Sequence, residues 1–368
     1  MAETLRTAVY YTEVDLNPPK ALKAYKEALY IGMEMGMHPF SDEVLGIKIQ
    51  VAMMLEKAGL VKPATEVLER TKVETLKWVE ERRKKFVLQR GEASVDAKQE
   101  GKTQDKIEIN DPEILETQKR LEELKEFEER QQDKALKKAV GIQMKLGELY
   151  SSDYIQDEKK AETAQVAAVE LSLKEMYRRQ SLGLPVGGGS QDENSNAWLN
   201  LSEMATALAD LATTYTAQDK PELAMPLYLR ALDLLRTDEG NNPTCKQVTL
   251  LNGVATVMAG HVQKPARQQQ QQRQQQQQPV PLEQTIDAAK QWAQKAIDVA
   301  ARIQPPVRDG DCDLSCVAAT YNLGELADFQ GKREEAIKRY QEAKSLASGL
   351  GFEDGVTMAD GALKRLKK

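Results

Sequence analysis

Cys312 and Cys316 are the residues whose types and spacing point most directly to chemistry. Because they are four residues apart near an expected helix start, their thiols would lie on one helical face. They are either two ordinary thiols or a redox-sensitive pair. With Cys245 they make an odd, small number, which argues against a disulfide framework. Structural zinc needs four ligands, and the two histidines, His38 and His261, are far away in sequence. We therefore predict no metal site.

The sequence contains no recognisable catalytic motif. HExxH, GxSxG, Walker and Rossmann patterns are all missing, and neither histidine has a motif neighbour. The many carboxylates are typical of charged helix faces and mark no catalytic pair. We therefore expect a protein that is not an enzyme and that needs no cofactor.

Composition favours helices and disfavours two classes of partner. Hydrophobic residues make up 41% of the 368 residues, charged residues 29% and aromatic residues 5%. The net charge of −6 disfavours nucleic acid. No stretch reaches the roughly 18 apolar residues of a membrane span, and the first residues have no signal-peptide pattern. We expect a soluble chain, either complete or part of a longer protein.

A spacing of twelve residues between small residues recurs along the chain. In the clearest copy, Leu323 and Gly324 are followed by Gly331, Ala336 and Tyr340. The pairs twelve residues apart are Val9 and Ala21, Ala52 and Ala64, Ala212 and Ala224, and Gly324 and Ala336. Such stripes predict two antiparallel helices joined by a turn, with small residues that let the helices approach closely. A single hairpin cannot bury its apolar faces, whereas stacked copies can.

This pattern resembles the tetratricopeptide (TPR) repeat, whose period is about 34 residues. The copy at 317–350 keeps most of the pattern, although Thr320 replaces the early Trp and Ser348 the late Pro. Two copies are interrupted. In one, the second helix around "AETAQVAAVELSLKEMYRR" comes a few residues late, and in the other Ala255 and Ala289 are 34 residues apart across a glutamine-rich insertion. The fold class predicted is an all-α TPR helix-turn-helix solenoid of about six repeats with long loop insertions and a C-terminal capping helix. The expected repeats are 2–35, 45–78, 140–181, 205–238, 248–302 and 317–350.

The interruptions define the domain organisation that we expect. Residues 1–90 hold repeats 1 and 2 with an extended second helix, followed by a flexible polar loop at 91–111. The third repeat, with its long first helix, occupies 112–182, and a Gly-rich loop follows at 183–196. Residues 197–302 hold repeats 4 and 5 with a polyglutamine insertion at 263–283. Repeat 6 covers 303–350 and the capping helix 351–368.

The long charged helices on either side of the polar loop are expected to pair as an antiparallel hairpin. Their basic run, Arg82 to Lys85, could contact anionic lipid or an acidic partner. The alternative, which we favour, is a solvated helix face balanced by Glu80 and Glu81.

The first helices of stacked TPR hairpins line a concave groove, which is the expected protein-binding surface. The candidate residues are Arg6, Tyr10, Ile49, Met53, Met144, Glu148, Asn252, Thr256, Tyr321 and Glu325. The middle of this lining is apolar and contains Met, which suits varied extended or helical segments. The alternative for each residue is that it packs within the stack.

One TPR class binds the C-terminal carboxylate of chaperones through basic residues and Asn. The matching positions here are Arg6, Tyr10, Gln50, Gly141 and Lys145, and in the second half Ala209, Thr213, Gly253, Ala318 and Asn322. Neither set reproduces the basic, Asn-rich clamp, so this mode is disfavoured.

Over about the first 70 residues the chain resembles the fungal TPR adaptor subunit of the mitochondrial inner-membrane i-AAA protease. The stretches are "YYTEVDLNPPKALKAYKEAL" and "MHPFSDEVLGIKIQVAMMLEKAG", in which Ser41 is a natural N-cap. The resemblance implies an adaptor that faces the intermembrane space, has an amino-terminal membrane anchor absent from this chain, and delivers unfolded or membrane-protein substrates to the protease. The rival functions are a static assembly scaffold and a cochaperone that binds chaperone C-terminal peptides.

Overall fold

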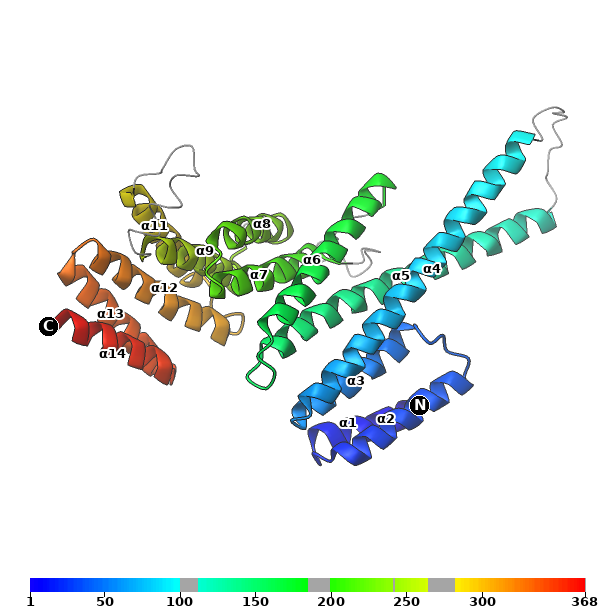
Figure 1. Cartoon of the computed structure of the whole chain (residues 1–368), viewed down its shortest axis with the longest axis horizontal. Coiled ribbons are helices and arrows are strands. Elements are labelled where there is room, and N and C mark those ends of the chain that lie inside the picture. The colour runs from blue at the N-terminus through cyan, green and yellow to red at the C-terminus, as the bar shows by residue number, and fades with distance from the viewer. Residues whose placement is uncertain (100–111, 185–198, 241, 264–281, 368) are drawn as a thin grey trace. The chain divides into compact units, whose positions relative to one another are not determined.

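The computed structural model describes residues 1–99, 112–184, 199–240, 242–263 and 282–367. Every regular element within these ranges is an α-helix, so the predicted all-α fold class is confirmed (Figure 1). The chain forms two compact units, one within Met1–Val186 and the other within Asn200–Lys368.

Unit 1 consists of helices that pack as consecutive pairs. They are α1 (Ala2–Glu13), α2 (Pro18–Glu34), α3 (Asp42–Lys57), α4 (Val61–Gln99), α5 (Pro112–Ser151) and α6 (Glu158–Ser181). Helix α1 packs on α2, α3 on α4, and α5 on α6, which gives the three hairpins that the repeat spacing predicts. The side chains of Asn17, Ser41 and Asp157 cap α2, α3 and α6 by accepting a backbone N–H bond, so three of the helix starts are fixed locally.

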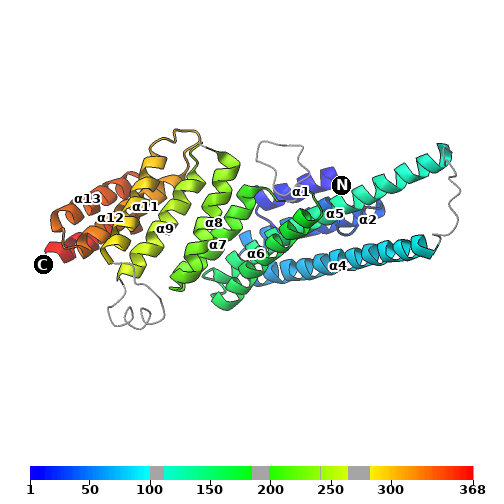
Figure 2. The ribbon, with the colours of Figure 1, turned by 90° about the horizontal axis from the view of Figure 1, so that it is seen from above.

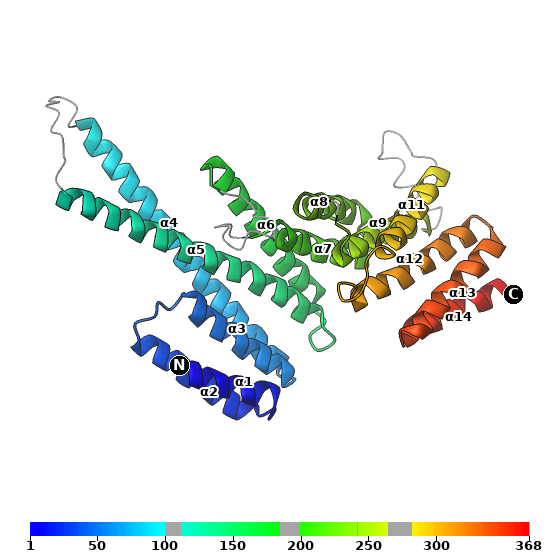
Figure 3. The same ribbon diagram turned by 180° about the vertical axis from the view of Figure 1, so that it is seen from behind.

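Unit 2 repeats this arrangement and ends with a single helix. Its helices are α7 (Leu201–Ala217), α8 (Pro221–Glu239), α9 (Cys245–Gln263), α11 (Leu282–Ala300), α12 (Gly310–Phe329), α13 (Arg333–Gly349) and α14 (Glu353–Lys367). Helix α7 packs on α8, α9 on α11, and α12 on α13. Helix α14 lies against α13, where a capping helix is expected (Figure 3). Most of the expected Gly-rich loop and polyglutamine insertion lies outside the described residues.

Small residues stand where the two helices of a hairpin cross. Ala21, Ala64, Ala224 and Ala336 are completely buried, as the shared spacing predicts. At Gly324 a side-chain carbon would lie 2.8 Å from the Tyr340 ring, which is closer than van der Waals contact allows. The missing side chain therefore makes the space that the tyrosine fills.

Helices α4 and α5 extend beyond the other helices of unit 1 (Figure 2). Helix α4 continues through residues 91–99, where we expected loop; the rest of that expected loop, 100–111, lies outside the described residues. The difference has a local reason, because Ala93, Ala97, Lys98 and Gln99 are good helix formers and Gly91 costs a helix only about 1 kcal/mol.

The described side chains of the two long helices meet at their inner parts, while apolar side chains further out on α5 are exposed. Arg82 of α4 bonds Glu128 of α5 at 3.1 Å. Further out on α5, Leu121, Leu124 and Phe127 are each more than half exposed. The expected antiparallel pairing therefore holds for the inner parts, while an apolar face of outer α5 stays open to solvent.

We predict that Gly324→Ala destabilises the α12–α13 hairpin, because the added methyl group would overlap the Tyr340 ring. Overpacking of this kind costs about 1–3 kcal/mol. Hydrogen exchange resolved over α12 and α13 should measure the loss, which a global melt of a two-unit chain would blur.

Gly361→Ala in α14 is the matched control, because a side-chain carbon there meets no atom within 4 Å. It should stabilise its helix by about 0.5–1 kcal/mol through the higher helix propensity of Ala. Equal effects of the two substitutions would contradict the packing role of Gly324.

Candidate protein-binding surface

In unit 1 the structure places the candidate groove residues on the three first helices of the hairpins. On α1, Arg6 and Tyr10 are exposed. Neighbouring helices α3 and α5 carry the apolar part: Met53 is 39% exposed, and Ile49 and Met144 are half-buried. Ile49 also packs against the core that includes Leu146, so part of its surface serves the stack. Met53 and Met144 thus form the accessible apolar part of the candidate surface.

Ion pairs connect these first helices at their exposed edges. Lys145 of α5 bonds Glu56 of α3 and Glu148 of its own helix, each at 2.9 Å. Lys57 of α3 bonds Glu13 of α1 at 2.5 Å. Exposed pairs contribute at most about 1 kcal/mol each. The ion pairs matter more for recognition than for stability. Lys145, one of the chaperone-clamp positions, already bonds two carboxylates of this chain, which compete with the carboxylate of a bound peptide.

In unit 2 two candidate residues of one first helix form hydrogen bonds with the next first helix. The Asn322 amide of α12 donates to Asn252 Oδ1 at 3.4 Å and to Thr256 Oγ1 at 3.0 Å, both on α9. Asn322 is 8% exposed, so the bonds satisfy a buried amide. These contacts of Asn252 and Thr256 favour the alternative interpretation, in which both residues pack within the stack and do not line a groove.

Of the last two candidates, Tyr321 and Glu325, only Glu325 lines a pocket of about 300 Å³ formed by residues of α12, α13 and α14. Its lining consists of Glu325, Asp328, Phe329, Tyr340 and Arg365. The Arg365 guanidinium donates to the Tyr321 hydroxyl, which in turn bonds Glu325.

The tyrosine in the pocket lining carries an unsatisfied polar group. Tyr340 is fully buried, and its hydroxyl has no hydrogen-bond partner among the described residues. A buried hydroxyl left without a partner costs about 1–3 kcal/mol. The repeat spacing predicts that Tyr340 packs within the hairpin, and nothing in that spacing signals an unpaired hydroxyl.

Three of the four residues in the basic run from Arg82 to Lys85 bond carboxylates. Arg83 bonds Glu175 of α6 at 2.9 Å, Arg82 bonds Glu128 of α5, and Lys84 bonds Glu80. The favoured interpretation as a face balanced by Glu80 thus holds for Lys84. It fails for Arg83, because α6 packs close enough to supply a buried partner.

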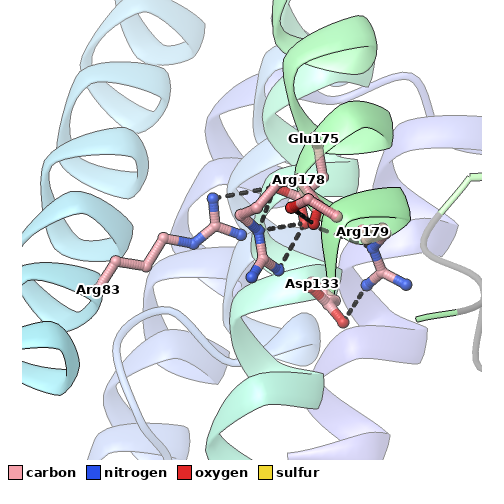
Figure 4. Close-up of polar contacts among 6 residues, drawn as sticks. Arg83, Asp133, Glu175, Arg178 and Arg179 are labelled. Carbon is pink, nitrogen blue, oxygen red and sulfur yellow. Dashed lines mark hydrogen bonds and ion pairs between the residues drawn. The ribbon is translucent and has the colours of Figure 1, made fainter. Parts of the chain in front are cut away.

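Arg83 belongs to a charged network between α4, α5 and α6 (Figure 4). Its centre is Glu175, 2% exposed, which also accepts from Arg178 at 2.8 Å and from Arg179 at 3.3 Å. Arg179, 2% exposed as well, pairs in addition with Asp133 of α5. Burial by itself raises the pKa of Glu175, but the hydrogen bonds and charges of Arg178 and Arg83 outweigh burial and lower it. The network therefore holds a carboxylate charged inside the helix packing and joins the bases of the two long helices to α6.

An aromatic cluster in unit 1 was also not predicted from the sequence. Phe40, just before α3, stacks on Trp78 of α4 with ring centroids 5.2 Å apart, and His38 lies 5.0 Å from the same ring. Burial and the charge of Arg82 lower the pKa of His38. The cluster fixes the segment between α2 and α3 against α4. Its partners are about 40 residues apart, so no local pattern signals it.

The three cysteines are free and buried, and they meet differently from the expected pair. Cys312 of α12 is hydrogen-bonded to Cys245 of α9, and burial together with this bond raises its pKa to about 12. Burial also raises the pKa of Cys316, against the opposing charge of Arg308. Protonated, buried thiols react slowly, which favours the interpretation as ordinary thiols.

Comparisons with known proteins agree with the fold. Residues 207–243 match the family described as Tetratricopeptide repeat. A TPR repeat-containing protein from Schizosaccharomyces pombe is 30% identical over 157 residues, which are 43% of this chain and 40% of that protein. The match thus spans well under half of this curated relative.

One solved structure of low sequence identity shares the architecture, and a second is similar at a lower TM-score. BtubC (BKLC) from P. vanneervenii has a TM-score of 0.53 at 14% identity, covering 92% of this chain and 93% of its own. Nearly identical TPR-like repeats of a putative kinesin light chain from Podosopora anserina give a TM-score of 0.44 at 11% identity, covering 85% and 98%. At such identities the likeness concerns the fold alone.

These matches support a tetratricopeptide repeat protein, and its repeats imply a protein-binding scaffold or adaptor. The TPR fold is generally a non-catalytic interaction scaffold. Among the described residues no helix is long and apolar enough to cross a membrane.

We predict that Glu175→Gln destabilises unit 1 by about 2–3 kcal/mol, because the buried Arg179 would lose one of its two carboxylates and the partly exposed Arg83 and Arg178 would lose theirs. Since the folded pKa of Glu175 lies below its ordinary value of 4.5, its stabilisation is present above that pH and is lost as the pH falls through the folded pKa. Hydrogen exchange over α5 and α6 between about pH 3 and pH 7 measures both effects.

The control is Glu170→Gln, on an exposed position of α6, which should change stability by no more than about 0.5 kcal/mol. If Glu175→Gln kept the acid sensitivity of the natural chain, another group would have to carry it.

Proposed function

We propose that this protein is a non-catalytic adaptor that binds segments of other polypeptides on the first helices of its TPR hairpins. The observation that carries this proposal is the accessible apolar surface of Met53 and Met144 on the neighbouring helices α3 and α5. Unbranched, polarisable Met side chains adapt to different partners, as recruitment of varied substrates requires.

The finer proposal is that the adaptor recruits unfolded or membrane-protein substrates to the mitochondrial i-AAA protease from the intermembrane-space side of the inner membrane. Its support is the resemblance of the first 70 or so residues to the fungal adaptor subunit. Within those residues, the "MHPFS" stretch supplies His38 and Phe40 to the aromatic cluster and Ser41 to the cap of α3. The projecting parts of α4 and α5 would be available to contact the protease or another subunit.

The substitution Met53→Glu should weaken binding of an unfolded polypeptide by about tenfold, because it places a charge where apolar contact is needed. The probe is fluorescently labelled, reduced and carboxymethylated α-lactalbumin, and the readout is fluorescence anisotropy with the full chain. Met33→Glu on α2 is the matched control, since Met33 is 57% exposed on a second helix. Similar losses in both variants would argue against a first-helix binding surface.

The protease assignment has its own test. The chain is used as bait in detergent-solubilised mitochondria, with mass spectrometry as the readout. We expect enrichment of a membrane-bound AAA protease together with its other subunits. Recovery of chaperones, or of one folded assembly without any protease, would contradict the assignment and favour the cochaperone or the scaffold.

A further inference from the structure

The pocket between α12, α13 and α14 differs from the same place in other repeats. Tyr25, Tyr228 and Tyr340 occupy equivalent positions on second helices, each between two alanines. The hydroxyl of Tyr25 lies 3.4 Å from Thr12 Oγ1, and that of Tyr228 lies 3.0 Å from Thr213 Oγ1. In those two hairpins a threonine of the first helix satisfies the tyrosine.

In the last hairpin an acid takes the place of Thr213, the partner of Tyr228. Thr213 directly follows Ala212, and the residue that directly follows the equivalent Gly324 is Glu325. Tyr340 keeps its buried place, but its hydroxyl has no partner among the described residues. An unpaired buried hydroxyl is unfavourable for folding, and a ligand that bonded it from the pocket would remove this cost.

The charges of the lining decide the class of that ligand. Glu325 and Asp328 contribute two carboxylates and Arg365 a single cation, which already donates to Tyr321. The net charge of the lining is therefore negative, so the pocket suits a cationic group that donates several hydrogen bonds. Phe329, 46% exposed, adds an aromatic face on which a planar cation can stack.

We propose that this pocket binds an arginine side chain of a polypeptide held by the adaptor. The guanidinium would donate to the carboxylates of Glu325 and Asp328 and to the Tyr340 hydroxyl while stacking on Phe329. Arginine fits better than lysine, because its planar fork donates several hydrogen bonds and stacks at the same time. The inference rests on the proposed function, since it names one feature of the polypeptides that the adaptor would select.

The test compares two fluorescein-labelled peptides of twelve residues built from Gly, Ser and Leu. One carries three arginines, and the other carries the neutral isostere citrulline at the same places. Fluorescence anisotropy with the full chain should give an affinity about tenfold higher for the arginine peptide. The double variant Glu325→Gln/Asp328→Asn should lose this preference.

Because the chain carries a net charge of −6, general attraction of a cationic peptide must be separated from the pocket. The double variant Glu334→Gln/Glu353→Gln changes the charge equally at exposed positions of α13 and α14, and it should keep the preference. Tyr340→Phe removes only the hydroxyl. It should raise the thermal midpoint of unit 2 and reduce the arginine preference about threefold.

Equal affinities for the two peptides, or an equal loss in the two double variants, would overturn the arginine site. If the chain still bound carboxymethylated α-lactalbumin in that case, the adaptor function would stand without the site. Failure to bind both peptides and the unfolded polypeptide would overturn the adaptor function as well.

Discussion

The close approach of two helices within each hairpin is the constraint on which the rest of the structure depends. It requires a small residue on one helix and a large one on the other, as Gly324 and Tyr340 illustrate. The fully buried alanines at equivalent places serve the same purpose. Because a hairpin packed this way still has an apolar face, it is stable next to further hairpins, and the stacked first helices then present a surface to partners.

The charged network around Glu175 is a second constraint, which acts on how α4, α5 and α6 pack. It does not follow from the repeat pattern. An apolar contact would hold α4, α5 and α6 together in many arrangements, whereas a buried carboxylate needs its guanidinium partners at defined positions. Arg83, Arg178 and Arg179 come from two helices and converge on one side chain. The network thus gives one defined attachment for the long helices that extend beyond unit 1. The same pairing removes Arg83 from any role as a free basic surface.

The candidate surface illustrates how one pattern produces different environments. By spacing, Met53, Thr256 and Glu325 are equivalent candidates for a groove. In the structure Met53 is accessible, Thr256 bonds the neighbouring first helix, and Glu325 lines a pocket. The neighbour determines the outcome, because a side chain next to the core stripe either meets another helix or faces solvent. A repeat protein can in this way keep its stack uniform while its binding residues differ from hairpin to hairpin.

The helices, their pairing and the small residues at their crossings can be predicted from the sequence, because those features depend on contacts within about 34 residues. Caps such as Ser41 and the twelve-residue spacing are local signals of this kind. Tertiary structure alone decided which candidate residues are accessible, that Cys312 meets Cys245 instead of pairing with Cys316, and that Arg83 reaches Glu175. It also decided that the Tyr340 hydroxyl is buried with no hydrogen-bond partner among the described residues. These contacts join residues from different helices, many of them far apart in the chain, and their formation depends on how the helices pack, which no periodicity along the sequence records.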